Sequence, residues 1–266
     1  MSRRRSFDGQ PDPGTDQRAT VPGGYLHSFV VTGRYSHDRR PMPACDALAM
    51  LLGVSVEQTM EDSTTPAEKL LGFLPLAERL KRELRHSWLS DGRRESVAEH
   101  TCFIALMALL SHGRLEQPVR LDRVLAMVIV HDLGEAEIGD IPFFEEGDRQ
   151  ARKAEREQAA MDRIATMLPA PEGEMVRQLW LEFEKGQTPE AKFVRALDHL
   201  EVQAQHNLAD LSTWEPVEHE LVYTKMDARC AHEPFLRQLL AGIRASAEAK
   251  MRDGGIDVDA VRDRLV

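Results

Sequence analysis

Apolar residues in this chain recur mainly at the three- and four-residue spacing of amphipathic helices. An apolar helical stretch over residues 44–60 is followed by the polar break EDSTTP. A second helix is predicted over residues 69–85, where Pro75 introduces a kink or a restart. Its apolar face is formed by leucines at positions 70, 71, 74, 76, 80 and 84.

The next two helices have clearer boundaries. Ser96 and Glu99 form the S-x-x-E pattern of a capping box, and Gly113 is expected to end the helix that begins there. The run from Val124 to Val130 is apolar on nearly every face. Because leucine, methionine and alanine are mixed with its valines, a buried helix is favoured over a strand.

The second half of the chain continues the helical pattern. A highly charged helix is predicted over 145–168 with one solvated face, and a shorter one over 172–185 that ends at Gly186. Thr188 and Pro189 then have the residue types of an N-cap and a first helical position. These segments together predict an all-α fold, a compact helical bundle.

The N-terminal part differs from this body. Residues 1–43 are rich in Gly, Pro, Arg and Asp, and only the run 25–32 has a strand-like pattern. We therefore expect residues 1–64 to be a poorly ordered or loosely attached extension. The main domain is expected over 65–252, followed by a C-terminal tail, 253–266, with a short helix.

The end of the run Val124–Val130 carries the first candidate chemistry. His131 and Asp132 follow it directly, and an imidazole beside a carboxylate is a typical pair of metal ligands. Considered alone, the pair also suits a helix C-terminus, where a cationic histidine is favourable. In so apolar a surrounding, however, the charge needs a partner.

A second polar anomaly lies in the segment AKFVRALDHLEVQAQ. Asp198 falls on or next to a stripe of apolar residues at helical spacing, where its carboxylate needs a cation. Alone it could pair with Arg195 or Arg177, just as His100 alone could be a core histidine. Joined to His100, His131 and Asp132, it completes a set of two imidazoles and two carboxylates from three helices. That set suits Mn, Fe, Co, Ni or Zn.

Composition limits the classes of partner. The chain has 266 residues and a net charge of -10, which argues against a nucleic-acid polymer or an anionic membrane surface but leaves a small phosphate ligand open. Its three cysteines suggest neither a disulfide framework nor a thiolate zinc site. Arginines at positions 3, 4 and 5 precede no apolar signal region, so a cytoplasmic location is expected.

The stretches ESVAEH, VIVHDLGEAEIGDIP and AKFVRALDHLE resemble the HD-domain phosphohydrolase superfamily, and more narrowly its 5'-deoxynucleotidase branch. The resemblance covers about residues 68–207. It implies a compact all-helical enzyme in which His100, His131, Asp132 and Asp198 bind the metal. It also implies a homodimer, with which the apolar face of 235–247 is compatible.

The same resemblance suggests the other site residues. Glu135 and Asp140 match the catalytic and substrate-contacting acids of the branch, and Arg85 matches a phosphate-contacting arginine. Members of the branch often carry a tryptophan next to or near this arginine, whereas Trp88 here lies three residues on. Arg82, Arg93 or Arg94 could therefore serve instead.

Further expectations concern the metal and the mechanism. Dinuclear HD phosphodiesterases and HD-type oxygenases typically use additional ligands in the interval between the second and the last motif. No histidine occurs between Asp132 and Asp198 here, so the resemblance implies a single metal. His199 is left out of the ligand set, because it is rotated by about 100° from Asp198 around a helix. If the helix continued beyond His131, Glu135 would share its face and could act on a water or a leaving oxygen. Asp140 could accept from a sugar hydroxyl or orient Arg85.

The leading hypothesis is a metal-dependent phosphohydrolase that converts (deoxy)nucleoside 5'-monophosphates to nucleoside and phosphate. Two alternatives remain open at this point. The scaffold could hydrolyse another phosphorylated metabolite or a nucleoside triphosphate, or it could be a non-catalytic module that binds a nucleotide.

Overall fold

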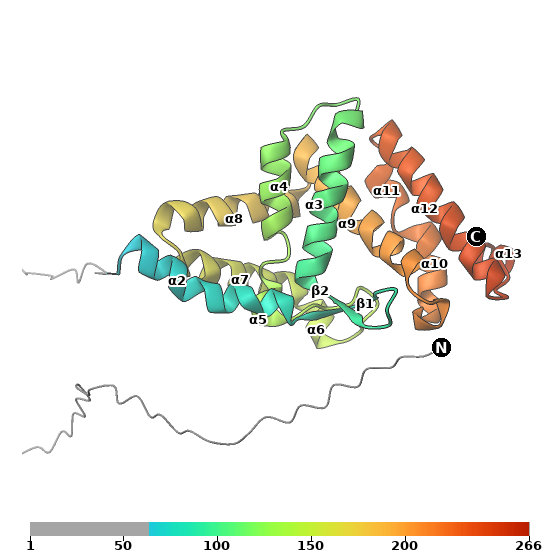
Figure 1. Ribbon diagram of the computed structural model, residues 1–266, viewed down its shortest axis with the longest axis horizontal. Helices are drawn as coiled ribbons and strands as arrows, with labels where there is room; N and C mark the ends of the chain where they lie inside the picture. The colour runs from blue at the N-terminus through green and yellow to red at the C-terminus, as the bar shows by residue number, and fades with distance from the viewer. Residues whose placement is uncertain (1–63, 266) are drawn as a thin grey trace, which may run out of the picture. The chain divides into compact units, whose positions relative to one another are not determined.

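The structure is a computed structural model that describes residues 64–265, and the expectations for the N-terminal extension lie outside this range. Helices dominate the described part, as predicted (Figure 1). They are α2 (Pro66–Ala77), α3 (Val97–Ser111), α4 (Leu121–Val130), α5 (Glu135–Ile138), α6 (Asp148–Ala151), α7 (Lys153–Met167), α8 (Ala170–Lys185), α9 (Pro189–Leu208), α10 (Pro216–Thr224), α11 (Asp227–Cys230), α12 (Pro234–Asp253) and α13 (Val258–Asp263).

Helix α9 is the centre of this arrangement. It packs against α3, α4 and α8 on one side and against α11 and α12 on another. Its side chains Val194, Leu197 and Leu200 are fully buried in the largest hydrophobic cluster, to which α3 contributes Ile104 and α4 contributes Met127. Residues that α9 presents to this interior therefore face several helices at once.

Two smaller clusters extend the core. One joins α2, α4, α7 and α8 around Met161 and Trp180. The other packs the C-terminal helices α10, α12 and α13 around Val222 and Met251, with Trp214 from the preceding connection. Trp180 and Phe183, the aromatic residues of α8, are both buried within the chain.

Several local predictions are confirmed. Ser96 caps α3, and its side chain accepts from the Glu99 backbone N–H while the Glu99 carboxylate accepts from the Ser96 backbone N–H. Gly186 ends α8 in the left-handed conformation, with φ 59°. The Thr188 hydroxyl accepts from the backbone of α9, which begins at Pro189 as predicted.

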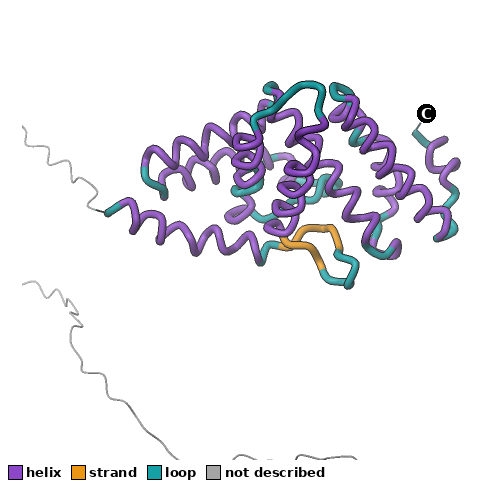
Figure 2. The backbone as a smooth tube through the Cα atoms, turned by 45° about the horizontal axis from the view of Figure 1, so that its top comes forward, coloured by secondary structure: helices purple, strands orange, loops and turns teal. Residues whose placement is uncertain are grey.

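The predicted helix over 69–85 is wrong in its second half. Helix α2 ends at Ala77, a 3₁₀ turn follows over Glu78–Lys81, and the chain then forms strand β1 (Leu84–Trp88). This strand pairs with β2 (Arg94–Ser96) as an antiparallel hairpin (Figure 2). The connection contains Asp91 and Gly92, a dipeptide typical of hairpin turns, and Gly92 has φ 86°.

Two other helix boundaries differ from the prediction. In the segment 145–168 the first helix begins only at Asp148, after Gly147 with a φ of 116°. Arg152 leaves the helical conformation and divides the segment into α6 and α7. Helix α3 ends at Ser111, two residues before Gly113, and Gly113 lies in a 3₁₀ turn over His112–Arg114. These differences are local and leave the order of the main helices intact.

Helices α7 and α8 approach closely at Gly173. A Cβ atom at this position would overlap the backbone carbonyl of Ala165. We predict that Gly173→Ala lowers the free energy of unfolding by about 1–3 kcal/mol, as overpacking usually does. Gly242 in α12 is the matched control, because no heavy atom lies within 4 Å of its Cβ position. Gly242→Ala should be neutral or raise stability by up to about 1 kcal/mol. Urea unfolding measures both, and equal effects would contradict the close approach.

Candidate functional site

The four side chains expected to bind a metal converge on one place beside α9. His100 lies in the first turns of α3 and is fully buried. His131 and Asp132 follow directly after α4, and Asp198 projects from α9. The imidazoles lie deeper than the carboxylates, since about a fifth of each aspartate side chain remains exposed.

Their polar atoms lie within a few ångströms of one another. His100 Nε2 is 3.2 Å from Asp198 Oδ1 and 3.7 Å from Asp132 Oδ2. His131 Nε2 is 3.1 Å from the same oxygen of Asp132. The ligand atoms of His100, His131 and Asp198 all lie within 4.8 Å of one another, a separation that one metal ion can bridge.

The Nδ1 nitrogen of each imidazole also has a polar contact, which fixes the orientation of the ring. His131 Nδ1 is 2.7 Å from the carbonyl oxygen of Val128, to which it donates. His100 Nδ1 is 2.5 Å from Glu201 Oε2. The buried His131 Nε2 has no hydrogen-bond partner among the described residues. This nitrogen, with two carboxylates beside it, fits a divalent metal that prefers imidazole and oxygen ligands.

Arg85 is the arginine that reaches this place. It belongs to β1, its side chain is 12% exposed, and its Nη1 lies 3.4 Å from Asp132 Oδ2. The alternatives are engaged elsewhere: Arg82 pairs with Glu78, Arg93 pairs with Glu99, and Arg94 stacks over Trp88. Arg85 was expected at the end of a helix and is instead positioned by the hairpin.

Glu135 faces the same interior, but the backbone that leads to it is not the continued helix that was expected. The helix does not continue past His131; a turn over 131–134 leads into the short helix α5. The Glu135 side chain is buried, and its Oε2 accepts no hydrogen bond within the described residues. Burial, reinforced by the charges of Asp132 and Asp140, raises the pKa of Glu135 well above its usual value. The carboxyl group is thereby favoured in its protonated form.

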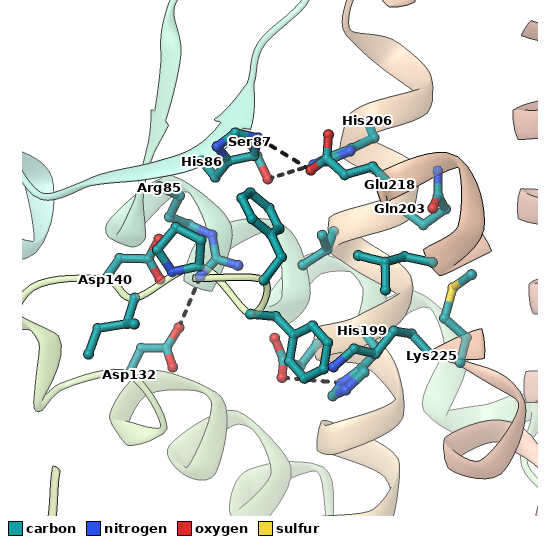
Figure 3. Close-up of a pocket in the computed structure, with 18 of the residues that line it drawn as sticks. Arg85, His86, Ser87, Asp132, Asp140, His199, Gln203, His206, Glu218 and Lys225 are labelled. Carbon is teal, nitrogen blue, oxygen red and sulfur yellow. Dashed lines mark hydrogen bonds and ion pairs between the residues drawn. The ribbon is translucent and has the colours of Figure 1, made fainter. Parts of the chain in front are cut away.

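Asp140 is placed by the turn that ends α5. Gly139 has φ 76°, a conformation that favours glycine, and a Cβ there would lie 2.9 Å from Glu83 Oε1. That same Glu83 oxygen accepts from the Asp140 backbone N–H at 3.0 Å. The Gly-Asp pair of the sequence motif therefore has a structural reason, because the turn directs Asp140 into the cavity beside Arg85 (Figure 3).

A cavity of about 270 Å³ joins these groups. One end holds Arg85, Asp132, Glu135, Asp140 and Asp198. The other end holds Gln203, His206 and Glu218 (Figure 3), and the rest of the lining includes the aromatic and apolar side chains Phe143, Phe144, Val202, Leu221 and Met226. The cavity is thus charged at one end and mixed in character at the other.

The second end contains a buried polar cluster that the sequence did not reveal. Glu218 Oε1 lies 3.4 Å from His86 Nε2 and 3.6 Å from His206 Nε2. His206 also lies 3.3 Å from the Ser87 hydroxyl. Burial opposes the charge of Glu218, but the two histidines outweigh it and lower its pKa. These residues come from β1, α9 and α10, so no local pattern links them.

Two lysines also line the cavity. Lys153 belongs to the charged segment expected to be solvated, yet it points inward and lies 3.6 Å from Glu157. Lys225 follows α10 and lies over the ring of Phe143. Burial and the nearby cation of Arg229 lower the pKa of Lys225 to about 8.

His199 lies beside Asp198 on α9. Its Nδ1 is 3.5 Å from Asp198 Oδ2 and 3.0 Å from the carbonyl oxygen of Arg195.

Comparison with known proteins places this arrangement in a family. The HD domain family matches residues 77–235, a range that contains every residue of the cavity. The chain belongs to the HD domain family. The predicted membership is therefore confirmed.

Individual relatives agree. The chain is 30% identical over 187 residues to the 5'-deoxynucleotidase HDDC2 of Bos taurus, covering 70% of this chain and 89% of the bovine protein. It is 35% identical over 157 residues to 5'-deoxynucleotidase HDDC2 of Homo sapiens, covering 58% and 72%. Among solved structures, a predicted metal-dependent phosphohydrolase from Magnetospirillum magnetotacticum matches with a TM-score of 0.60 and 29% identity, over 72% of this chain and 98% of its own.

The buried histidine at the second end of the cavity predicts a pH effect on stability. Burial lowers the pKa of His206 below that of an exposed histidine. As pH falls through the unfolded-state pKa of about 6.5, the unfolded chain binds a proton that the folded chain does not, and stability drops. His206→Gln should remove up to about 1.4 kcal/mol per pH unit from this slope between pH 7 and 5. Urea unfolding at several pH values tests it, and an unchanged slope would contradict the prediction.

Proposed function

We propose that the protein is a metal-dependent phosphohydrolase that converts (deoxy)nucleoside 5'-monophosphates to nucleoside and phosphate. The observation that carries this proposal is the shared cavity. The carboxylates of Asp132 and Asp198 line one end of it together with Arg85 and the buried Glu135. Behind them, His131 Nε2 lies 3.1 Å from Asp132 Oδ2 and His100 Nε2 lies 3.2 Å from Asp198 Oδ1. The relatives named 5'-deoxynucleotidase support the same substrate class.

The metal would be held by His100, His131, Asp132 and Asp198. A divalent ion there supplies a Lewis acid for the phosphoryl oxygen and lowers the pKa of a water molecule. We propose one transition metal per chain, chosen from Mn, Co, Fe, Ni and Zn. The mixed ligand set accepts each of them, so the identity of the ion depends on availability as well as affinity.

Glu135 is proposed as the catalytic acid. Hydrolysis forms a bond from a water oxygen to phosphorus and breaks the bond from phosphorus to the 5'-oxygen, which needs a proton as it leaves. Burial raises the pKa of Glu135, so its carboxyl group is suited to carry and donate that proton. This role is supported by the cavity, which Glu135 lines together with Asp132 and Asp140.

The cations of the cavity would bind the phosphate. Arg85 presents a guanidinium that can hold two phosphate oxygens at once, and Lys153 and Lys225 add positive charge. Asp140, beside Arg85, can orient this guanidinium or accept from a sugar hydroxyl. The nucleoside would then extend towards Phe143 and the cluster around Glu218. A preference for deoxynucleotides would arise if a 2'-hydroxyl found no partner there, at a cost of about 1–3 kcal/mol.

Assembly and location are further parts of the proposal. We infer a homodimer, supported by an apolar groove between α9 and α12 that includes Leu208, Phe235 and Ile243. Leu208 is 58% exposed there.

None of the described helices combines the length and apolarity needed to cross a lipid bilayer. A cytoplasmic enzyme remains our expectation.

Phosphate release tests the proposed activity. We expect the full chain to release phosphate from deoxynucleoside 5'-monophosphates with Mn²⁺ or Co²⁺, and to lose this activity after treatment with a chelator. Asp198→Ala should abolish both metal binding and release. Equal rates for ribo- and deoxynucleotides would contradict the proposed preference for deoxynucleotides. Turnover only of triphosphates or of other phosphate esters would replace the substrate class, and binding without turnover would indicate a regulatory module.

Glu135 can be tested separately from the metal. Glu135→Gln keeps the size of the side chain but removes the proton donor, so kcat should fall by about 10²–10⁴-fold. Metal content should be retained. Glu137→Gln is the matched control two residues on, because Glu137 pairs with Arg163 outside the cavity. We expect its kcat to stay within about twofold of the unsubstituted protein, as for other surface changes. A similar kcat for both variants would refute the role of Glu135.

A further inference from the structure

A buried carboxylate lies behind the proposed metal ligands and has no role in the mechanism above. Glu201 is fully buried, and its Oε2 lies 2.5 Å from Nδ1 of the equally buried His100. Asp198 lies 3.2 Å from the other ring nitrogen of the same histidine. Since Asp198 and Glu201 are three residues apart on α9, one helix holds the imidazole of His100 from both sides.

We propose that Glu201 is a positioning residue that fixes His100 for metal binding. A neutral imidazole carries one proton, and hydrogen bonding of Nδ1–H to the Glu201 carboxylate leaves the lone pair on Nε2. That nitrogen faces Asp198 and Asp132. The inference rests on the metal site of the proposed function, but it concerns a residue outside the ligand set.

The second histidine shows the same principle with a different partner. His131 donates from Nδ1 to the backbone carbonyl of Val128 in the preceding turn. His100 sits in the first turns of α3, and its Nδ1 is instead met by a side chain from a helix distant in sequence. Because an anion strengthens the ligand more than a carbonyl does, Glu201 should make His100 the more basic of the two ligands.

The surroundings of Glu201 argue against a second metal in the same place. Glu95, His100 and Glu201 present ligand atoms within 4.8 Å of one another, which alone would suit a cation. However, a cation is already present, because Arg85 Nε lies 3.6 Å from Glu95 Oε2. His100 Nδ1, the ring nitrogen of this group, is also committed to Glu201. We therefore assign this cluster to orientation.

Metal affinity tests the proposal without any turnover. Co²⁺ is titrated into the full chain by calorimetry and by visible absorption, with far-UV circular dichroism to verify folding. Glu201→Ala should weaken Co²⁺ binding by about 10–100-fold, the range typical of such outer partners. Glu201→Gln retains an acceptor oxygen without the charge, so its affinity should lie between those of Glu201→Ala and the unsubstituted protein.

The matched control is Glu248→Gln. Glu248 is another buried glutamate, bonded to Tyr223 and Arg262 in the C-terminal cluster and away from the cavity. Its Co²⁺ affinity should stay within about threefold, even where its thermal stability drops. A structural role for Glu201 alone would likewise change stability and leave the Co²⁺ affinity of the folded protein unchanged.

The outcomes are distinct. Folded Glu201→Ala protein that binds Co²⁺ as tightly as the unsubstituted chain overturns the inference and leaves the proposed function intact. Binding of two Co²⁺ ions per chain, one of them lost in Glu95→Gln, makes Glu201 a ligand and also overturns it. Normal Co²⁺ behaviour in all arms without phosphate release from any nucleotide overturns only the proposed activity. No Co²⁺ binding by the unsubstituted chain overturns both.

Discussion

The structure depends on one constraint: ionisable side chains are buried in an apolar helical interior, where each charge needs a partner. Helix α9 creates the constraint, because it presents Asp198 and Glu201 to the same interior as Leu197 and Leu200. His100 meets both carboxylates. Buried carboxylates this close together repel one another. The positive charge of Arg85 offsets this repulsion, and a bound divalent metal would offset it further.

The backbone elements around this cluster position its members with little freedom. Three local backbone features matter most: the capping box that starts α3, the turn that follows α4, and the positive-φ glycine that ends α5. Each is local, and each places one polar side chain at the cavity. The scaffold that holds them is the contact of α9 with α3, α4 and α8. The long helices α3 and α9 thus carry His100 and Asp198, and the turn after α4 carries His131 and Asp132. Glu135 begins the short helix α5, and Asp140 follows the glycine that ends it.

The sequence was sufficient for the parts that local patterns determine. Helix type, the cap at Ser96 and the end of α8 at Gly186 follow from periodicity and capping chemistry. His100, His131, Asp132 and Asp198, grouped as metal-ligand types and through the resemblance to the HD superfamily, do lie together. The pattern failed at 69–85, because leucine spacing extends through Leu84 although that residue lies in a strand and is 54% exposed. The dipeptide Asp91-Gly92 was an available signal for the hairpin.

Residues joined only by tertiary structure could not be found in this way. Glu218, His86 and Ser87 meet His206 across α10, β1 and α9, and nothing in their local sequence distinguishes them from surface residues. Lys153 was assigned to a solvated face because its helix is highly charged. Glu201 is the exception, since a glutamate three residues after Asp198 lies on the same helical face and shares its burial. Periodicity applied to polar as well as apolar residues would therefore have identified the partner of His100, and it is the polar stripe of α9 that distinguishes this helix from an ordinary core helix.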